Sequence, residues 1–190
     1  MDCSAAHGNC PDVKVHQLGI PGAWLLQESR HVDVRGAFTR VGQFPELREL
    51  GLACDEAQLS YAHNTTAGTI RGMHYQLAPH HETKLIWCVS GAAFDVLVDL
   101  RPDSPTRGRW IASELTTADS LALLVPPGLA HGYQCLTDST TLMYLISSAY
   151  HPPSARVLRW DDPTVGIAWP LPLGTISARD ASAPPWPPEL

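Results

Sequence analysis

The sequence lacks any apolar run approaching the roughly 18 residues that span a bilayer, and residues 1–8 contain neither the basic nor the apolar part of a secretory signal. Its five cysteines form no CxxC pair, and Cys88 and Cys135 lie within apolar runs, where a free thiol packs as a small hydrophobe. This pattern argues against a zinc knuckle or a disulfide scaffold. We therefore predict a cytoplasmic chain that does not enter a membrane.

A strongly basic surface is also missing, because the net charge is −6. This balance argues against broad nucleic-acid binding, whereas a few local arginines and lysines can still hold a small anionic ligand. With 190 residues, of which 44% are hydrophobic and 17% charged, the chain is long enough to bury the core of one globular domain.

Seventeen prolines and fourteen glycines interrupt the chain at short intervals, which favours short strands joined by tight turns. One helix is expected, near residues 45–50, because proline suits a first helical position. The spacing predicts an all-β sandwich or barrel. The predicted organisation is a disordered segment over 1–12, one domain over 13–180 and a proline-rich tail over 181–190. The clearest strand candidates are 84–90, 92–100, 110–115, 122–125 and 140–148.

The densest group of chemically active side chains lies between residues 71 and 84. Strand alternation would place Arg71 and His74 on opposite faces, but Gly72 between them permits a bulge that turns both inward. Lys84 follows at the start of an apolar run. Three such cationic or titratable groups within fourteen residues favour a functional site over a solvated loop.

Two further segments contribute candidates. His131 leaves a proline–glycine turn and enters a strand, and Tyr144 shares a strand face with apolar neighbours. Asp95 lies in a strand where a buried carboxylate requires a hydrogen-bond partner, for which a histidine is suited. Two chemistries fit this set. Histidines and carboxylates can bind a metal, whereas His, Lys and Tyr can serve as base, enolate-stabilising cation and acid at a carbon next to a carbonyl.

An ordered series of motifs resembles the dTDP-4-dehydrorhamnose 3,5-epimerase family. The run GTIRGMHYQ is its most specific member, and an early D-x-R-G-x-F element precedes it. Each motif is weak alone, but their common order over about residues 33–180 is specific. The matching segments are 33–38, 68–76, 84–86, 95–101, 103–106, 127–133, 159–163, 166–170 and 177–180.

The resemblance implies a cupin-like double-stranded β-helix, or jelly-roll barrel, with one or two short helices. It also implies a homodimer that needs neither metal nor organic cofactor. The implied substrate is a dTDP-4-keto-6-deoxyhexose, inverted at C3, C5 or both. The matching positions assign His74 as general base, Asp180 as its partner, Tyr144 as proton donor and Lys84 as the group facing the C4 oxygen. The positions matched to substrate or nucleotide contacts, or to their support, are Arg71, Gln76, His131, Arg35, Phe38 and Asp95.

Departures from the family pattern concern substrate choice. Residues 58–64 do not follow a Q-x-N-x-S pattern, and Arg40 stands near a usually acidic position. Both a rhamnose pathway and a secondary-metabolite deoxysugar pathway remain open. One rival is a metal-dependent cupin using His74 and His131 with His80, His81 or Glu82, although the HxH spacing fails at Gln76. A non-catalytic sugar-nucleotide-binding protein is the other.

Overall fold

A computed structural model describes residues 14–27, 29–41, 44–52 and 57–186, and thirteen strands dominate it. The predicted disordered segment 1–12 lies outside the described residues. The strands are β1 Lys14–Gln17, β2 Trp24–Gln27, β3 Ser29–Asp33, β4 Gly36–Arg40, β5 Gln58–Asn64, β6 Ile70–Gln76, β7 Lys84–Ser90, β8 Ala92–Asp99, β9 Trp110–Thr116, β10 Leu121–Val125, β11 Leu129–Cys135, β12 Thr140–Ile146 and β13 Ala155–Val157. Two short helices are α1 Phe44–Glu49 and α2 Ala178–Ala181.

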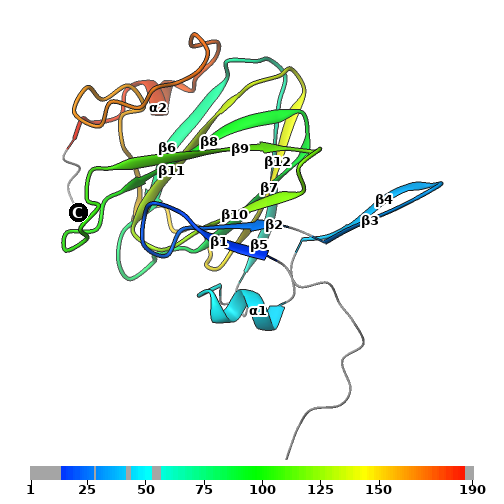
Figure 1. Cartoon of the computed structure of the whole chain (residues 1–190). Coiled ribbons are helices and arrows are strands. Elements are labelled where there is room, and N and C mark those ends of the chain that lie inside the picture. Colours follow the sequence, from blue (N-terminus) through cyan, green and yellow to red (C-terminus); the bar gives the residue numbers. More distant parts are fainter. Residues whose placement is uncertain (1–13, 28, 42–43, 53–56, 187–190) are drawn as a thin grey trace, which may run out of the picture.

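Two antiparallel sheets face each other to form the barrel (Figure 1). One sheet has the order β1-β2-β10-β7-β12-β5, and the other has the order β13-β6-β11-β8-β9. Neighbouring strands come from distant parts of the chain, as in a double-sheet jelly roll. The all-β class, the two-sheet architecture and the short helices are confirmed.

The five predicted strands match β7, β8, β9, β10 and β12 to within two residues at each end. They are apolar and rich in branched side chains, which fit a pleated and buried surface. The predicted helix is α1, which begins one residue earlier, at Phe44.

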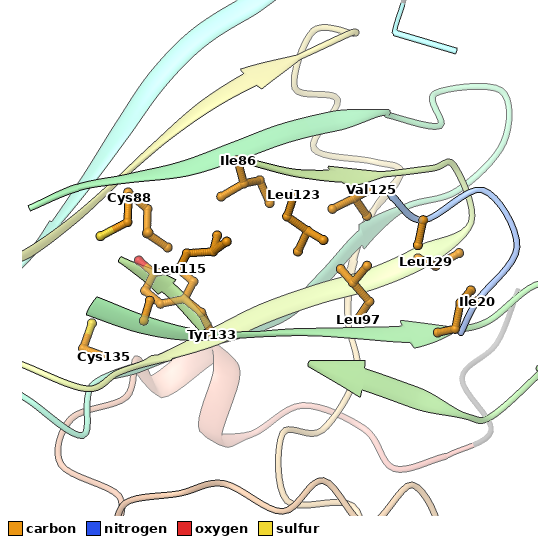
Figure 2. Packing of buried hydrophobic residues seen from close by; sticks show 13 residues of the cluster. Ile20, Ile86, Cys88, Leu97, Leu115, Leu123, Val125, Leu129, Tyr133 and Cys135 are labelled. Atoms are coloured by element: carbon orange, nitrogen blue, oxygen red, sulfur yellow. The ribbon is translucent and has the colours of Figure 1, made fainter. Parts of the chain in front are cut away.

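The main core fills the space between the sheets (Figure 2). Ile86 and Leu123 point inward from the larger sheet, and Leu97 and Tyr133 point inward from the other, all at most 2% exposed. Successive strand residues alternate between faces, so each strand sends every second side chain into this layer. Burying one such aliphatic side chain contributes about 1.5–3 kcal/mol.

The outer face of the β6–β11–β8 sheet is covered by the C-terminal segment. Met73, Val96 and Leu158 form a second buried cluster there, against which Trp169 and Trp186 pack. The Trp186 N–H donates to the Asp162 carboxylate at 2.7 Å, so the proline-rich segment is anchored at least to this residue.

Strands β3 and β4 form a separate hairpin that projects from the barrel (Figure 1). They pair only with each other among the described strands. In the described part of the chain, no helix has the length and apolar character to cross a membrane.

Candidate active site

A bulge in β6 turns the first two candidate side chains to the same side. In its pairing with β11, Arg71 lies opposite Tyr133 and His74 opposite His131, so Gly72 and Met73 share the single partner Gly132. Gly72 has φ 135°, and a Cβ there would lie 2.5 Å from the Gly132 Cα. Glycine is required because the two backbones touch. The expected inward bulge is confirmed, and Arg71 and His74 line one cavity.

His74 is held by a carboxylate from the far end of the chain. Its Nε2 lies 2.8 Å from Asp180 Oδ1, and the Asp180 side chain is 4% exposed. With the proton on Nε2, the imidazole donates to Asp180 and Nδ1 becomes the nitrogen that can accept a proton. This is the geometry that a histidine base with an orienting carboxylate would have.

Asp180 is itself fixed at the start of α2. Its N–H donates to Ser177 Oγ at 3.1 Å, and its Oδ2 accepts the Gly72 N–H at 3.2 Å. Burial opposes ionisation, but hydrogen bonds from His74, Gly72 and Ser177 outweigh it and lower the pKa of Asp180. The bulge and the carboxylate are therefore coupled, because the glycine that turns His74 inward also binds its partner.

A second histidine–carboxylate pair lies deeper, between β11 and β8. His131 Nε2 lies 2.9 Å and 3.0 Å from the two Asp95 oxygens, and the two side chains are 5% and 0% exposed. The Tyr144 ring packs edge-on against His131, with 6.1 Å between ring centroids. Asp95 thus meets the partner expected from the sequence.

Two tyrosines, Tyr133 and Tyr144, lie beside His131. Burial raises the pKa of Tyr133 to about 12 and raises that of Tyr144 well above its ordinary value. The neighbouring Tyr133 and Asp95 raise the pKa of Tyr144 further. A phenol in this environment keeps its proton at neutral pH and can donate it only to a strongly basic carbon or oxygen.

Lys84 opens β7 and faces the same cavity as His74. Its Nζ lies 2.7 Å from Glu82 Oε1, and the two side chains are 9% and 14% exposed. Gln76, at the end of β6, donates to the second Glu82 oxygen at 3.2 Å. The structure therefore brings the candidate base and the candidate enolate-stabilising cation into one space.

Two adjoining cavities, of about 360 and 190 Å³, meet at His74. Arg71 lies on the first, Arg156 on the second and Arg179 on both. Arginine forks bind phosphate oxygens in a bidentate way. The arrangement suits an anionic substrate whose reactive end reaches His74 and Lys84.

Arg35 and Phe38 lie elsewhere, on the β3–β4 hairpin. They border a separate hollow of about 490 Å³ together with Asp33. The Arg35 side chain is ion-paired with Asp33 and largely exposed. A hollow of about 610 Å³ between Tyr75, Leu100 and Arg101 is larger but includes neither His74 nor Lys84.

The metal-binding alternative finds no donor set in the described residues, where no three His, Cys, Asp or Glu side chains converge on a common point. His74 and His131 are each bound to their own carboxylate. His80 stacks on His151, with 3.6 Å between ring centroids. Glu82 is engaged by Lys84.

Sequence reasoning missed two contributors to this site. From the sequence, Glu82 is expected only as a possible metal ligand, although its position two residues before a buried lysine is a usable signal. Asn64 receives the Arg71 Nε–H at 2.7 Å and donates to the Tyr133 hydroxyl at 3.2 Å. No local pattern indicated that contact.

Comparison with known proteins agrees with this geometry. The profile of the family described as dTDP-4-dehydrorhamnose 3,5-epimerase matches residues 17–187. A protein of that description from Mycobacterium tuberculosis is 39% identical over 176 residues, covering 90% of this chain and 87% of the relative. A dTDP-4-dehydrorhamnose 3-epimerase from Streptomyces niveus is 34% identical, covering 90% and 83%.

Solved structures show the same similarity. The Mycobacterium tuberculosis epimerase superposes with a TM-score of 0.86 at 39% identity, covering 90% of this chain and 88% of that one. A 3'-monoepimerase from Streptomyces bikiniensis, solved in complex with dTDP-quinovose, has a TM-score of 0.84 at 36% identity, covering 90% and 86%. Relatives that invert one centre and relatives that invert two therefore share this barrel.

Proposed function

Because the chain belongs to the dTDP-4-dehydrorhamnose 3,5-epimerase family, we propose that it inverts C3, C5 or both in a dTDP-4-keto-6-deoxyhexose. Membership makes the chain an isomerase of deoxysugar biosynthesis, and the metal-dependent alternative is not supported. The observation that carries the proposal is the pair His74–Asp180 sharing a cavity with Lys84.

The first chemical step is removal of a proton beside the ketone. The C4 carbonyl acidifies the C–H bonds at C3 and C5, and Nδ1 of His74 accepts one of these protons. The electron pair of that bond moves onto the C4 oxygen to form an enolate. Asp180 stabilises the resulting imidazolium through Nε2, where the hydrogen bond already exists at 2.8 Å.

Lys84 stabilises the enolate, and Tyr144 completes the inversion. The buried ammonium lies where charge develops on the C4 oxygen, and such preorganised stabilisation is a large catalytic contribution. Tyr144 then donates its phenolic proton to the carbon from the opposite face, and solvent replaces that proton. The raised pKa of Tyr144 supports this role, because it keeps the phenol protonated until the carbanion forms.

Substrate binding extends to the nucleotide in this proposal. Arg71 and His131 contact the sugar and its phosphates, Asp95 holds His131, and Gln76 lines the cavity beside Glu82. Arg35 and Phe38 contribute to the nucleotide site of a second copy in a cytoplasmic homodimer. The projecting hairpin supports this arrangement, because its Phe38 is 66% exposed on a single chain.

The proposed activity is tested by incubating the protein with dTDP-4-keto-6-deoxyglucose in heavy water and following C3 and C5 by NMR. Deuterium at both carbons with inverted product identifies a double epimerase, and deuterium at one carbon identifies a monoepimerase. A protein-free sample controls for spontaneous exchange. Absence of incorporation above that control, repeated with other dTDP-4-ketosugars, would refute the proposal.

A further inference from the structure

The chain contains only two lysines, Lys14 and Lys84, and they differ sharply in environment. Lys14 is exposed at the start of β1, whereas the Lys84 side chain is 9% exposed inside the cavity with His74. An isolated buried ammonium is costly, so it requires polar or charged partners around it.

Glu82 is the carboxylate that meets this ammonium. Its Oε1 lies 2.7 Å from Lys84 Nζ, and its Oε2 accepts from Gln76 Nε2 at 3.2 Å. Both carboxylate oxygens are thus engaged, in a space that the proposed mechanism uses but with no step assigned to Glu82.

The backbone around this pair is fixed on both sides. Thr83, between the two charged residues, donates its N–H to Ser147 Oγ at 2.9 Å and accepts the Ser147 N–H at 2.9 Å. Gln76 also donates to the His80 carbonyl at 3.0 Å, and its Oε1 accepts the His151 N–H at 2.7 Å. The Gln76 amide therefore braces the loop that carries Glu82.

This geometry assigns different acceptors to the three N–H donors of the Lys84 ammonium group. Lysine has three N–H donors, one of which points to Glu82 and two of which remain for other acceptors. The carboxylate compensates the buried charge and fixes the direction of the remaining donors. A misplacement of such a group by about 1 Å can cost on the order of 100-fold in rate.

We propose that Glu82 is a positioning residue for the epimerisation, holding the Lys84 ammonium in place and aimed at the C4 oxygen of the substrate. This role rests on the proposed function and adds to it a residue that acts only through Lys84. Gln76 supports it by fixing the carboxylate rather than by touching the substrate.

The kinetic test compares Glu82→Gln, Lys84→Met and the double variant with dTDP-4-keto-6-deoxyglucose. Glu82→Gln is expected to lower kcat by about 10–100-fold, with KM changed less than about threefold because the loss falls on the transition state. The double variant should be no slower than Lys84→Met alone, since Glu82 has nothing left to position. Glu114→Gln, the same change at an exposed position of β9, is the control.

A second readout does not depend on turnover. Protein labelled with 15N in lysine contains two labelled side-chain ammonium groups. The substitution Lys14→Arg leaves only that of Lys84. A hydrogen-bonded ammonium signal is expected in this variant and should disappear when Glu82→Gln is added. Glu114→Gln should leave it unchanged.

The outcomes separate this role from the proposed function. The role of Glu82 would be overturned, while epimerisation stands, if kcat of Glu82→Gln lies within about twofold of wild type. It would also be overturned if the two single losses in kcat multiply in the double variant. Loss of the ammonium signal in Glu82→Gln, together with a lower kcat that is not lowered further in the Lys84→Met background, would establish it. A wild-type protein inert toward every dTDP-4-ketosugar would refute both.

Discussion

The contact between His74 and Asp180 joins two residues 106 positions apart. In the proposed mechanism Asp180 contributes orientation as well as charge, because Nε2 must carry the proton if Nδ1 is to accept one. An asparagine in its place can donate its own N–H to Nε2 and so favours the opposite tautomer. The role of the base and the role of its partner are therefore separable by mutation.

We predict that His74→Ala lowers epimerisation by about 10²–10⁴-fold and that Asp180→Asn lowers it by about 10²-fold or more. Both variants should keep the barrel, as judged by circular dichroism and thermal unfolding. Asp161→Asn, which removes an exposed carboxylate 38% accessible to solvent, is the matched control. Near-normal rates for His74→Ala would remove His74 from the role of base.

In the proposed mechanism Tyr144 acts after the proton is removed, so its loss should uncouple exchange of the C–H proton from inversion of the carbon. We predict that Tyr144→Phe still exchanges a substrate C–H proton with deuterium but forms at least tenfold less inverted product. NMR of the sugar in heavy water measures both quantities at once. Tyr61→Phe, at a tyrosine 74% exposed on β5 and outside both cavities that meet at His74, should leave their ratio unchanged. Full inversion by Tyr144→Phe would exclude it as the donor.

Among the structural elements, the long apolar strands were predictable and the short polar ones were not. Strand β7 is an apolar run between turn signals, so its bounds follow from composition. Strands β3 and β13 are short and largely exposed or polar, and only their pairing partners define them. Helix α2 has four residues, too few for a periodic signal, although Ser177 caps it.

The same limit applies to the site. His74 and Lys84 lie close in sequence, so a local pattern could suggest them together. Only the family resemblance predicts Asp180, because no local pattern connects it to β6. The contact between Glu82 and Gln76 depends on how the intervening loop folds back, which composition does not specify.

The bulge in β6 is the element that holds the site together, which gives a test at Gly72. An added Cβ would lie 2.5 Å from the Gly132 Cα and require a side chain at φ 135°. We predict that Gly72→Ala lowers the free energy of unfolding by about 2–4 kcal/mol and abolishes epimerisation. Urea unfolding measures the first effect. Gly36→Ala tests the strain alone, because Gly36 has φ 127° but open space around its Cβ position.

Asp99 fixes the loop that leaves β8. Its fully buried carboxylate accepts from Arg101, Ser104 and Thr106. Burial alone would raise the pKa of Asp99, but these hydrogen bonds lower it from 3.8 to about 2. Because the folded pKa lies below the unfolded one, the resulting stabilisation of about 2 kcal/mol is present above about pH 4 and is lost as the pH falls through about 2.

We therefore predict that Asp99→Asn lowers the free energy of unfolding by about 2–4 kcal/mol at pH 7. The difference from wild type should narrow between about pH 4 and pH 2, as the wild-type carboxylate protonates. Urea titrations across this range measure it. Asp103→Asn, at an exposed position of the same loop, should change stability by less than about 0.5 kcal/mol. A difference independent of pH would contradict the assignment.

At the scale of the whole molecule, the β3–β4 hairpin projects from the barrel and, among the described strands, pairs with neither of its two sheets (Figure 1). A two-stranded hairpin is marginally stable by itself. Here it exposes Val32 at 73%, Val34 at 105% and Phe38 at 66%. Neighbouring exposed apolar groups are typical of surfaces that contact another protein. The proposed second copy of this chain would cover the hairpin and receive Arg35 at its nucleotide site.

This arrangement predicts linked changes in assembly and substrate binding. Sedimentation equilibrium should give the mass of a dimer for the wild type, and Val32→Ser combined with Phe38→Ser should shift it toward the 20.7 kDa monomer. Losing two buried apolar side chains weakens association by about 3–6 kcal/mol. The same variant should raise KM far more than it lowers kcat, because His74 and Lys84 lie in the barrel and not on the hairpin. Leu173→Ser, at a leucine 42% exposed outside the hairpin, should change neither quantity. If the wild type is a monomer and its KM equals that of the doubly substituted variant, each barrel binds its nucleotide alone.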